Sequence, residues 1–356
     1  MKFQKAFFAF LLLFIAVADS AFSDSLYFYK KRNFGSEALY NPINMILNGS
    51  FDIIQLDGHS RRIFPFPYKK ATENVFRNLA NPIPAINNYG WGNLLTDEVL
   101  PIHIFRKGAQ WWPNYQLHLI GGGMTYTMTK EWFQLHNFNS PELYSIGTMF
   151  VYHFLNEVVE NAEYSSDNAA AIADFYIFDV GGIILFSSPS VNKFFSEELN
   201  LADWSLQPSF SLPHFRMHNN GQYFSIKWKL PFSEKYSLFY YFGMNGLAGL
   251  SYTLPDATSL SFGAGLRAKE LVSLNEPRRK QTVTVVWNSG IFYDKDNSLL
   301  ASLFFSGLTD YTTQLNIYPG VLRIENFSPG VWCVLGKKGN VLFGITTVWL
   351  PGVAVE

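Results

Sequence analysis

Apolar and polar side chains alternate along the C-terminal part of the chain, from about residue 205 onward. In residues 223–230 the apolar side chains occupy every second position, and the lysines lie between them. Residues 260–269 repeat the pattern, with leucine, phenylalanine and alanine opposite serine, glycine, arginine and lysine. A period of two places alternate side chains on opposite faces of a β-strand. Each run therefore predicts a strand with one apolar face and one face of polar or small residues.

Further runs of this kind follow one another and are separated by turn-forming residues. The additional strand-like runs are residues 236–244, 282–288, 299–308, 314–324, 331–336 and 341–349. Asp, Asn, Pro, Gly and Lys fill the segments between them, for example at 294–297 and 337–340. Strand and turn in regular succession predict an antiparallel meander.

Two closed architectures use such a meander. In a soluble sandwich or barrel the apolar face turns inward, whereas in a membrane barrel it meets lipid and the polar face lines the lumen. The small-residue face and the aromatic residues near strand ends favour the membrane barrel. We therefore predict an all-β, mainly antiparallel fold, a transmembrane β-barrel of about 10–12 strands with a helical insert. A soluble secreted β-barrel or sandwich that binds lipid is the alternative. The aromatic residues concerned are Trp228, Tyr240, Tyr241, Trp287, Tyr293, Trp332 and Trp349.

The composition excludes several classes of protein and of binding site. Charged residues make up 15% of the chain, against a usual share of about 25%, and aromatic residues make up 17%. A disordered chain is excluded, because such chains combine high charge with few aromatic residues. The net charge of −1 gives no basic footprint, so we expect no nucleic-acid partner. Cys333 is the only cysteine, which excludes an internal disulfide and a cysteine-based zinc site.

The first residues have the composition of an export signal. Lys2 and Lys5 precede an apolar run over residues 6–17, which ends in small residues. This run is shorter than the roughly 20 residues of a membrane-spanning helix. We predict that residues 1–18 are a cleaved signal peptide and that the mature chain works outside the cytoplasm, in the cell outer membrane.

The segment between the signal and the strands has no regular pattern. We interpret residues 19–110 as an irregular N-terminal segment, either a plug, a lid or the first hairpin. The predicted barrel then covers residues 111–356. Its first strand is expected at 111–129, where Gly121–Gly123 would allow a bend or close packing.

The alternation stops between about residues 141 and 200, where apolar residues follow helical spacing. Ser140 and the proline that follows it predict the start of a first helix. An alanine-rich run over 168–180 predicts a second helix, which the following glycine pair is expected to end. A third short helix is expected over 190–199. We interpret residues 141–200 as a helical insert in the barrel.

Acidic residues and a histidine gather within this insert. His153, Glu157 and Glu160 lie at i, i+4 and i+7, which places them on one helix face. Asp167, Asp174 and Asp179 follow on the next segment. Such groups on facing helices suit either acid–base catalysis or binding of a divalent cation.

Roles can be assigned to these residues only as alternatives. His153, Glu157 and Asp174 are the candidate catalytic residues, and Glu160 and Asp167 are candidate ligands of a divalent cation, the one cofactor that the pattern suggests. The plainer interpretation is a polar stripe, or a hydrogen-bond network that anchors the insert. The sequence has no Gly-x-Ser-x-Gly, His-Glu-x-x-His or phosphate-loop motif that would specify a reaction.

Several short motifs between residues 89 and 187 form an ordered series. The series resembles a widespread group of bacterial outer-membrane β-barrel proteins of uncharacterised function, in which an aromatic-acidic helix precedes a Ser-x-Asp cap and a glycine pair. The resemblance implies an outer-membrane location and a helical insert, and it implies no reaction. The motifs are Tyr89-Gly90-Trp91, Asn114-Tyr115, Phe154-Leu155-Asn156-Glu157 with Glu160 and Asn161, Ser165-Ser166-Asp167 and Asp179-Val180-Gly181-Gly182.

Three functions follow from this pattern. The first is a structural, transport or lipid-interacting role in the bacterial envelope, with outer-membrane lipid and the barrel-insertion machinery as partners. The second is an envelope enzyme that acts on lipid or glycan through the acidic residues and histidine of the insert. The third is a soluble secreted protein that binds lipid. The sequence does not indicate an oligomeric state.

Overall fold

The computed structural model describes residues 25–101, 112–162, 164–212, 214–275, 280–337 and 339–356, without the side chains of residues 273–282. The predicted signal peptide lies outside these residues. The chain divides into two compact units, which we describe separately. The helical unit contains residues 25–27, 66–192 and 272–283, and the sheet unit contains residues 28–65, 193–271 and 284–356.

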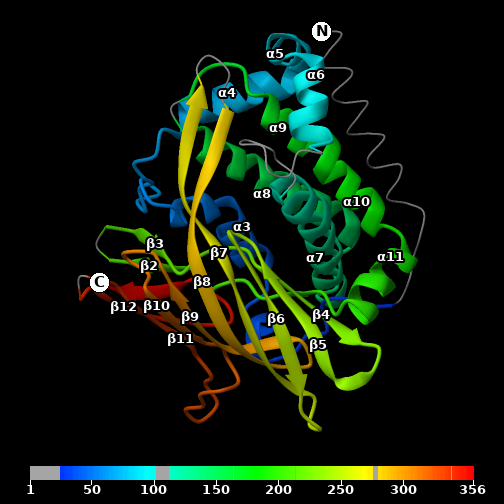
Figure 1. Ribbon diagram of the computed structural model, residues 1–356, viewed down its shortest axis with the longest axis vertical. Coiled ribbons are helices and arrows are strands. Elements are labelled where there is room, and N and C mark those ends of the chain that lie inside the picture. The colour runs from blue at the N-terminus through cyan, green and yellow to red at the C-terminus, as the bar shows by residue number, and fades with distance from the viewer. Residues whose placement is uncertain (1–24, 102–111, 163, 213, 276–279, 338) are drawn as a thin grey trace. The chain divides into compact units, whose positions relative to one another are not determined.

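The helical unit consists mostly of helices from Tyr68 onward (Figure 1). Several of them have π-helical stretches, in which backbone hydrogen bonds join residues i and i+5. Its elements are α4 (Tyr68–Ala80), α5 (Pro82–Tyr89), α6 (Trp91–Asn93), η2 (Leu94–Val99), η3 (Trp112–Gly122), α7 (Gly123–Leu135), α8 (Pro141–Asn161), α9 (Ala169–Ala173), η4 (Asp174–Asp179), α10 (Val180–Phe186) and α11 (Pro189–Lys193).

Glycines lie where helices of this unit pack closely, and the predicted helices can be compared with them. The predicted helix from Pro141 is confirmed as α8, and the predicted second helix is also present. That second helix runs on through its glycine pair, however, because α9, η4 and α10 are continuous to Phe186. A Cβ atom added to Gly182 would lie 2.7 Å from the backbone oxygen of Leu119, so the glycine permits close packing of η3 against α10.

The sheet unit contains one sheet and a few short helices. These helices are α2 (Gly35–Ala38), α3 (Pro42–Ser50), η1 (Asp52–Gln55) and η5 (Phe194–Glu198). The strands follow the order β1-β4-β5-β6-β7-β8-β9-β10-β11-β12-β13-β2-β3. They are β1 (Ala202–Asp203), β2 (Ser209–Ser211), β3 (Arg216–His218), β4 (Phe224–Leu230), β5 (Ser233–Phe242), β6 (Asn245–Thr253), β7 (Thr258–Asn275), β8 (Lys280–Lys295), β9 (Ser298–Ser306), β10 (Thr313–Ile317), β11 (Gly330–Leu335), β12 (Val341–Thr346) and β13 (Gly352–Val355).

The predicted all-β fold with a transmembrane β-barrel of about 10–12 strands is wrong. Helices account for 39% and strands for 32% of the chain, and the 13 strands form one open sheet that does not close into a barrel. Alternation identifies single strands, but it does not fix how the ends of a sheet meet. The ends here are very short strands, with two residue pairs joining β1 to β4 and three joining β13 to β2, the latter in parallel.

The sequence analysis also predicted too few helices. The strand predicted over 111–129 is instead helical from Trp112 onward, where the chain forms η3 and α7. Helix α7 is buried on nearly every side, so its apolar residues make no one-sided stripe that would reveal the 3.6-residue period. Helices are therefore not confined to the expected insert over 141–200.

The sheet exposes apolar side chains on one face and buries polar side chains on the other. On β7, Leu260, Phe262 and Leu266 are exposed, whereas Ser261 and Arg267, which point to the other face, are buried. Neighbouring strands repeat the arrangement: the exposed residues include Trp228, Leu238, Leu250, Val283, Val285, Trp287, Ile291, Leu315, Val341, Phe343, Ile345, Val353 and Val355. A sheet that faces water does the reverse.

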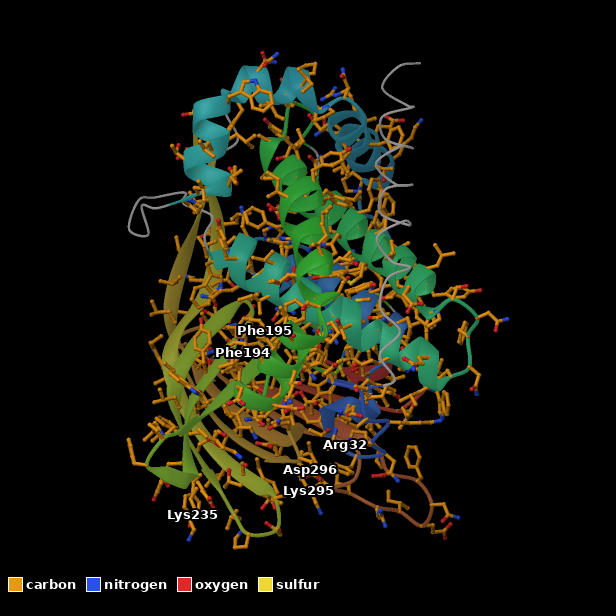
Figure 2. All side chains as sticks on the ribbon, turned by 90° about the vertical axis from the view of Figure 1, so that its right-hand side faces the viewer. Arg32, Phe194, Phe195, Lys235, Lys295 and Asp296 are labelled. Carbon is orange, nitrogen blue, oxygen red and sulfur yellow. The ribbon has the colours of Figure 1, made fainter. Side chains whose placement is uncertain are left out.

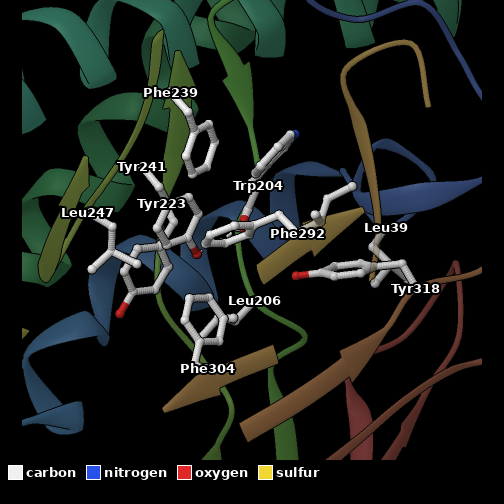
Figure 3. Packing of buried hydrophobic residues seen from close by; sticks show 11 residues of the cluster. Leu39, Trp204, Leu206, Tyr223, Phe239, Tyr241, Leu247, Phe292, Phe304 and Tyr318 are labelled. Atoms are coloured by element: carbon white, nitrogen blue, oxygen red, sulfur yellow. Dashed lines mark hydrogen bonds between the residues drawn. The ribbon is translucent and has the colours of Figure 1, made fainter. Parts of the chain in front are cut away.

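Polar contacts and aromatic rings fill the buried face of the sheet. The Lys227 ammonium donates to the Asp294 carboxylate at 2.7 Å, and Arg267 donates to Gln55 of η1 at 3.3 Å. Residues 28–65 therefore pack against this polar face. Beside these contacts lies a cluster of large side chains (Figure 3), composed of Leu39, Trp204, Leu206, Tyr223, Phe239, Tyr241, Leu247, Phe292, Leu299, Phe304 and Tyr318.

Candidate functional site

Two histidines and three acidic residues meet inside the helical unit. His118 comes from η3, His153 and Glu157 from α8, and Asp174 and Asp179 from the two ends of η4. His153 is 3% exposed and each aspartate 8% exposed. The cluster is therefore an interior feature of the helical unit and not a solvated surface stripe.

Asp179 is the centre of the cluster. Its Oδ1 atom lies 3.2 Å from Nδ1 of His118 and 3.0 Å from Nδ1 of His153. The two imidazole rings lie 5.3 Å apart between centroids. Asp174 approaches the other nitrogen of His118, with 3.9 Å between Nε2 and Oδ2, and it hydrogen-bonds with the Glu157 side chain. One histidine thus lies between two carboxylates.

The π-helical stretch explains how both aspartates reach the cluster. Residues five positions apart in an α-helix point about 140° away from each other, since each residue turns the helix by about 100°. In a π-helix, residues i and i+5 are joined by a backbone hydrogen bond, so they lie toward the same side of the helix. The η4 stretch spans Asp174–Asp179, so it turns both carboxylates to the same side.

The charges of the buried groups follow from their neighbours. Burial alone would raise the pKa of Asp179, but the two imidazoles outweigh it and lower that pKa. Burial opposes the charged form of His118, yet Asp174 and Asp179 raise its pKa to about 10. Burial lowers the pKa of His153, so this imidazole is neutral at pH 7. Burial raises the pKa of Asp174 to about 7.

Glu98 adds a fourth buried carboxyl group near Asp174. It is 5% exposed, and burial followed by the charge of Asp174 raises its pKa to about 8. It receives a hydrogen bond from the Tyr89 hydroxyl at 3.0 Å. Among the described residues, four buried atoms of this region have no hydrogen-bond partner: His153 Nε2, Asp174 Oδ1, Asp179 Oδ2 and Glu98 Oε2.

The structure brings together the three residues proposed from the sequence as catalytic, His153, Glu157 and Asp174. The two proposed metal ligands fall elsewhere or at the margin. Glu160 is close enough to act electrostatically on Asp174. Asp167 is partly exposed and accepts a hydrogen bond from Asn88 at 2.6 Å, outside the cluster.

The sequence analysis did not place His118 or Glu98 in the site, and it named Asp179 among the acidic residues without assigning it a role. His118 was expected on a strand, and its helix has no periodic stripe that would have corrected this. Asp179 lies five residues after Asp174, a spacing that gives no shared face until the π-helical turn is known. Glu98 lies far from the insert in sequence, and no short motif links it to Asp174.

A serine, a histidine and an acid also meet in the sheet unit, at β2 and β3. Ser211 Oγ lies 3.3 Å from Nε2 of His218, and a Glu356 carboxylate oxygen lies 3.0 Å from that same nitrogen. A nucleophilic triad needs the acid on the opposite nitrogen from the serine, so that the imidazole can relay a proton. This arrangement is therefore not a serine-hydrolase triad.

Within the part of the chain that the structure describes, one helical stretch is long and apolar enough to cross a membrane. It covers Ala169–Phe186, with a mean hydropathy of 1.8, and half of it is buried in the protein. It also contains Asp174 and Asp179, whose side chains face the cluster. We treat it as the core helix of the helical unit.

Comparisons with protein-family models, curated proteins and solved structures find no match to this chain. The resemblance to bacterial outer-membrane proteins therefore stays a prediction, and the function has to be argued from the geometry.

Proposed function

We propose that the protein is a lipid-interacting protein of the bacterial cell envelope, located at the outer membrane, whose exposed apolar sheet face lies against lipid. The observation that carries this function is the burial pattern of the sheet. Leucine, phenylalanine, valine and tryptophan are exposed on successive strands, while Lys227 and Arg267 are buried behind them. Soluble monomers rarely expose a continuous apolar patch larger than a few hundred Å².

The position of the charges supports the same function. Lys235, Lys295 and Asp296 lie at turns and strand ends of the sheet (Figure 2), and each is exposed. Charges there can stay in water while the middle of the face contacts hydrocarbon. A charged side chain in the middle of a lipid-facing surface costs about 2–4 kcal/mol. The scarcity of charged side chains in the middle of the sheet face therefore favours lipid as the partner that covers this face.

The geometry gives less support to an enzyme that acts on lipid or glycan through His153, Glu157 and Asp174. All three side chains are buried in the helical unit. A bulky substrate cannot touch them in this conformation, whereas a proton or a small ion can.

Vesicle flotation tests the function directly. The chain from residue 19 onward is refolded from urea with phosphatidylethanolamine–phosphatidylglycerol vesicles and centrifuged through a density gradient. We expect the unchanged chain to float with the vesicles. Phe262→Asn/Leu266→Asn should shift most of the protein to the dense fractions, because burying two amides in hydrocarbon is unfavourable.

A matched variant controls for a general loss of apolar surface. Leu143 and Ile184 of the helical unit are each 54% exposed, the same fraction as Phe262 and Leu266. Leu143→Asn/Ile184→Asn should float like the unchanged chain. Recovery of the unchanged chain in the dense fractions, or equal flotation of both variants, would contradict lipid contact through the sheet.

A further inference from the structure

The histidine–carboxylate cluster has the donor atoms of a transition-metal site. The candidate donors of His118, His153 and Asp179 all lie within 4.8 Å of one another. An ion with bonds of 2.0–2.1 Å to its ligands holds neighbouring donor atoms roughly 2.9–3.4 Å apart. The separations of 3.2 Å and 3.0 Å between Asp179 Oδ1 and the two imidazoles fall in that range.

A second observation, independent of the donor set, also points to a ligand. His153 Nε2, Asp179 Oδ2 and Asp174 Oδ1 are buried and have no hydrogen-bond partner. Each buried polar atom left unpaired costs about 1–3 kcal/mol, so three in one cluster indicate a group that the polypeptide alone does not supply. Acidic residues also outnumber histidines in the cluster, and a bound cation would offset their buried negative charge.

We propose that this cluster binds one first-row divalent transition-metal ion, such as Zn²⁺ or Fe²⁺, through a ring nitrogen of His118, a ring nitrogen of His153 and the carboxylate of Asp179. Two imidazoles and a carboxylate suit these ions. Mg²⁺ and Ca²⁺ prefer oxygen ligands, so the two imidazoles disfavour them. Three protein ligands leave one or more positions of the ion for water or another small ligand.

Asp174 has a separate role in this site. It faces the second nitrogen of His118 and is itself hydrogen-bonded with Glu157. A carboxylate behind a metal-binding histidine orients the ring and raises its basicity. Asp174 and Glu157 therefore position His118 and are not needed as ligands. The inference uses the helical unit alone and does not rest on lipid contact by the sheet.

Metal titration of the full chain, purified in detergent without a polyhistidine tag and stripped with EDTA, tests the site. We expect one Co²⁺ per chain, with visible d–d absorption that Zn²⁺ abolishes by displacement. Asp179→Asn should weaken Co²⁺ binding by more than 100-fold. Asp174→Asn should weaken it by about 10–100-fold, the usual range for a residue behind a ligand.

Two controls keep the outcome interpretable. The His136 ring makes a hydrogen bond with the Trp132 carbonyl oxygen and stacks on the Trp132 ring, away from the cluster. The His136→Gln variant should therefore bind Co²⁺ like the unchanged chain. Circular dichroism checks the helical fold of each variant, and His118→Gln replaces Asp179→Asn if the latter does not fold. Absence of stoichiometric Co²⁺ in the unchanged chain, or unaltered affinity in a folded ligand variant, would overturn the metal site.

Discussion

Helix α4 and strand β7 sort their side chains in opposite senses. On α4, Ala71, Val75 and Leu79 are buried while Lys69 and Arg77 are exposed, as in any helix at the surface of a water-soluble unit. On β7, Leu260, Phe262 and Leu266 are exposed and Arg267 is buried. The charged side chains of α4 therefore face outward, whereas β7 presents its apolar side chains and buries its arginine.

The buried charges of the two units differ as well. In the sheet unit, Lys227 and Asp294 are 7% and 0% exposed at the side chain and form a balanced pair. In the helical unit, two histidines face a larger number of carboxyl groups, among them Asp174, Asp179 and Glu157. The charges of Lys227 and Asp294 offset each other, whereas buried acids in excess take up protons or a cation.

Breaking the balanced pair is expected to have the largest effect. Lys227→Met leaves Asp294 buried without its counter-charge, and the loss should be about 3–5 kcal/mol of unfolding free energy. Urea titration followed by circular dichroism in detergent measures it. Lys227→Met/Asp294→Leu removes both charges and should recover most of the loss. A single variant as stable as the unchanged chain would show that the pair is not buried as described.

A smaller, pH-dependent effect is expected at Glu98. Its pKa is about 8 in the folded protein and near 4.5 in the unfolded chain, so the folded state keeps a proton that the unfolded state has lost. This group therefore contributes full stability below pH 4.5, and the contribution falls by about 1.4 kcal/mol per pH unit until pH 8. Glu98→Gln should flatten that fall in the metal-free protein.

Urea titrations between pH 4.5 and 9 measure the Glu98 effect. Asp167→Asn is the matched control, because Asp167 is a partly exposed acid of the same unit that lies outside the cluster. It should keep the slope of the unchanged chain. Equal slopes for all three proteins would show that Glu98 is not held protonated by its surroundings.

The strands could be predicted from the sequence far better than the sheet they form. Alternation placed the runs at 223–230, 236–244, 299–308 and 331–336, and strands are present in all four. Alternation is a local property of side chains on a pleated strand. Closure depends on pairing between distant segments such as β13 and β2, on which the pattern of a single run has no bearing.

The site could be predicted only in part, for a related reason. His153 and Glu157 share a face of an ordinary α-helix, so their spacing was informative. Asp179 reaches the cluster only through the π-helical turn of η4, and His118 lies on a helix mistaken for a strand. Regular helix geometry therefore explains only the pairing of His153 with Glu157.

Fluorescence quenching by brominated lipid tests the central claim, that the sheet presents its apolar face to lipid, most directly. Trp228 and Trp287 are each 55% exposed on this face, whereas Trp204 and Trp332 are buried. In vesicles of brominated phosphatidylcholine, Trp228→Phe/Trp287→Phe should lower the quenched fraction of the fluorescence, and Trp204→Phe/Trp332→Phe should raise it. An equal quenched fraction in the two double variants would contradict the claim.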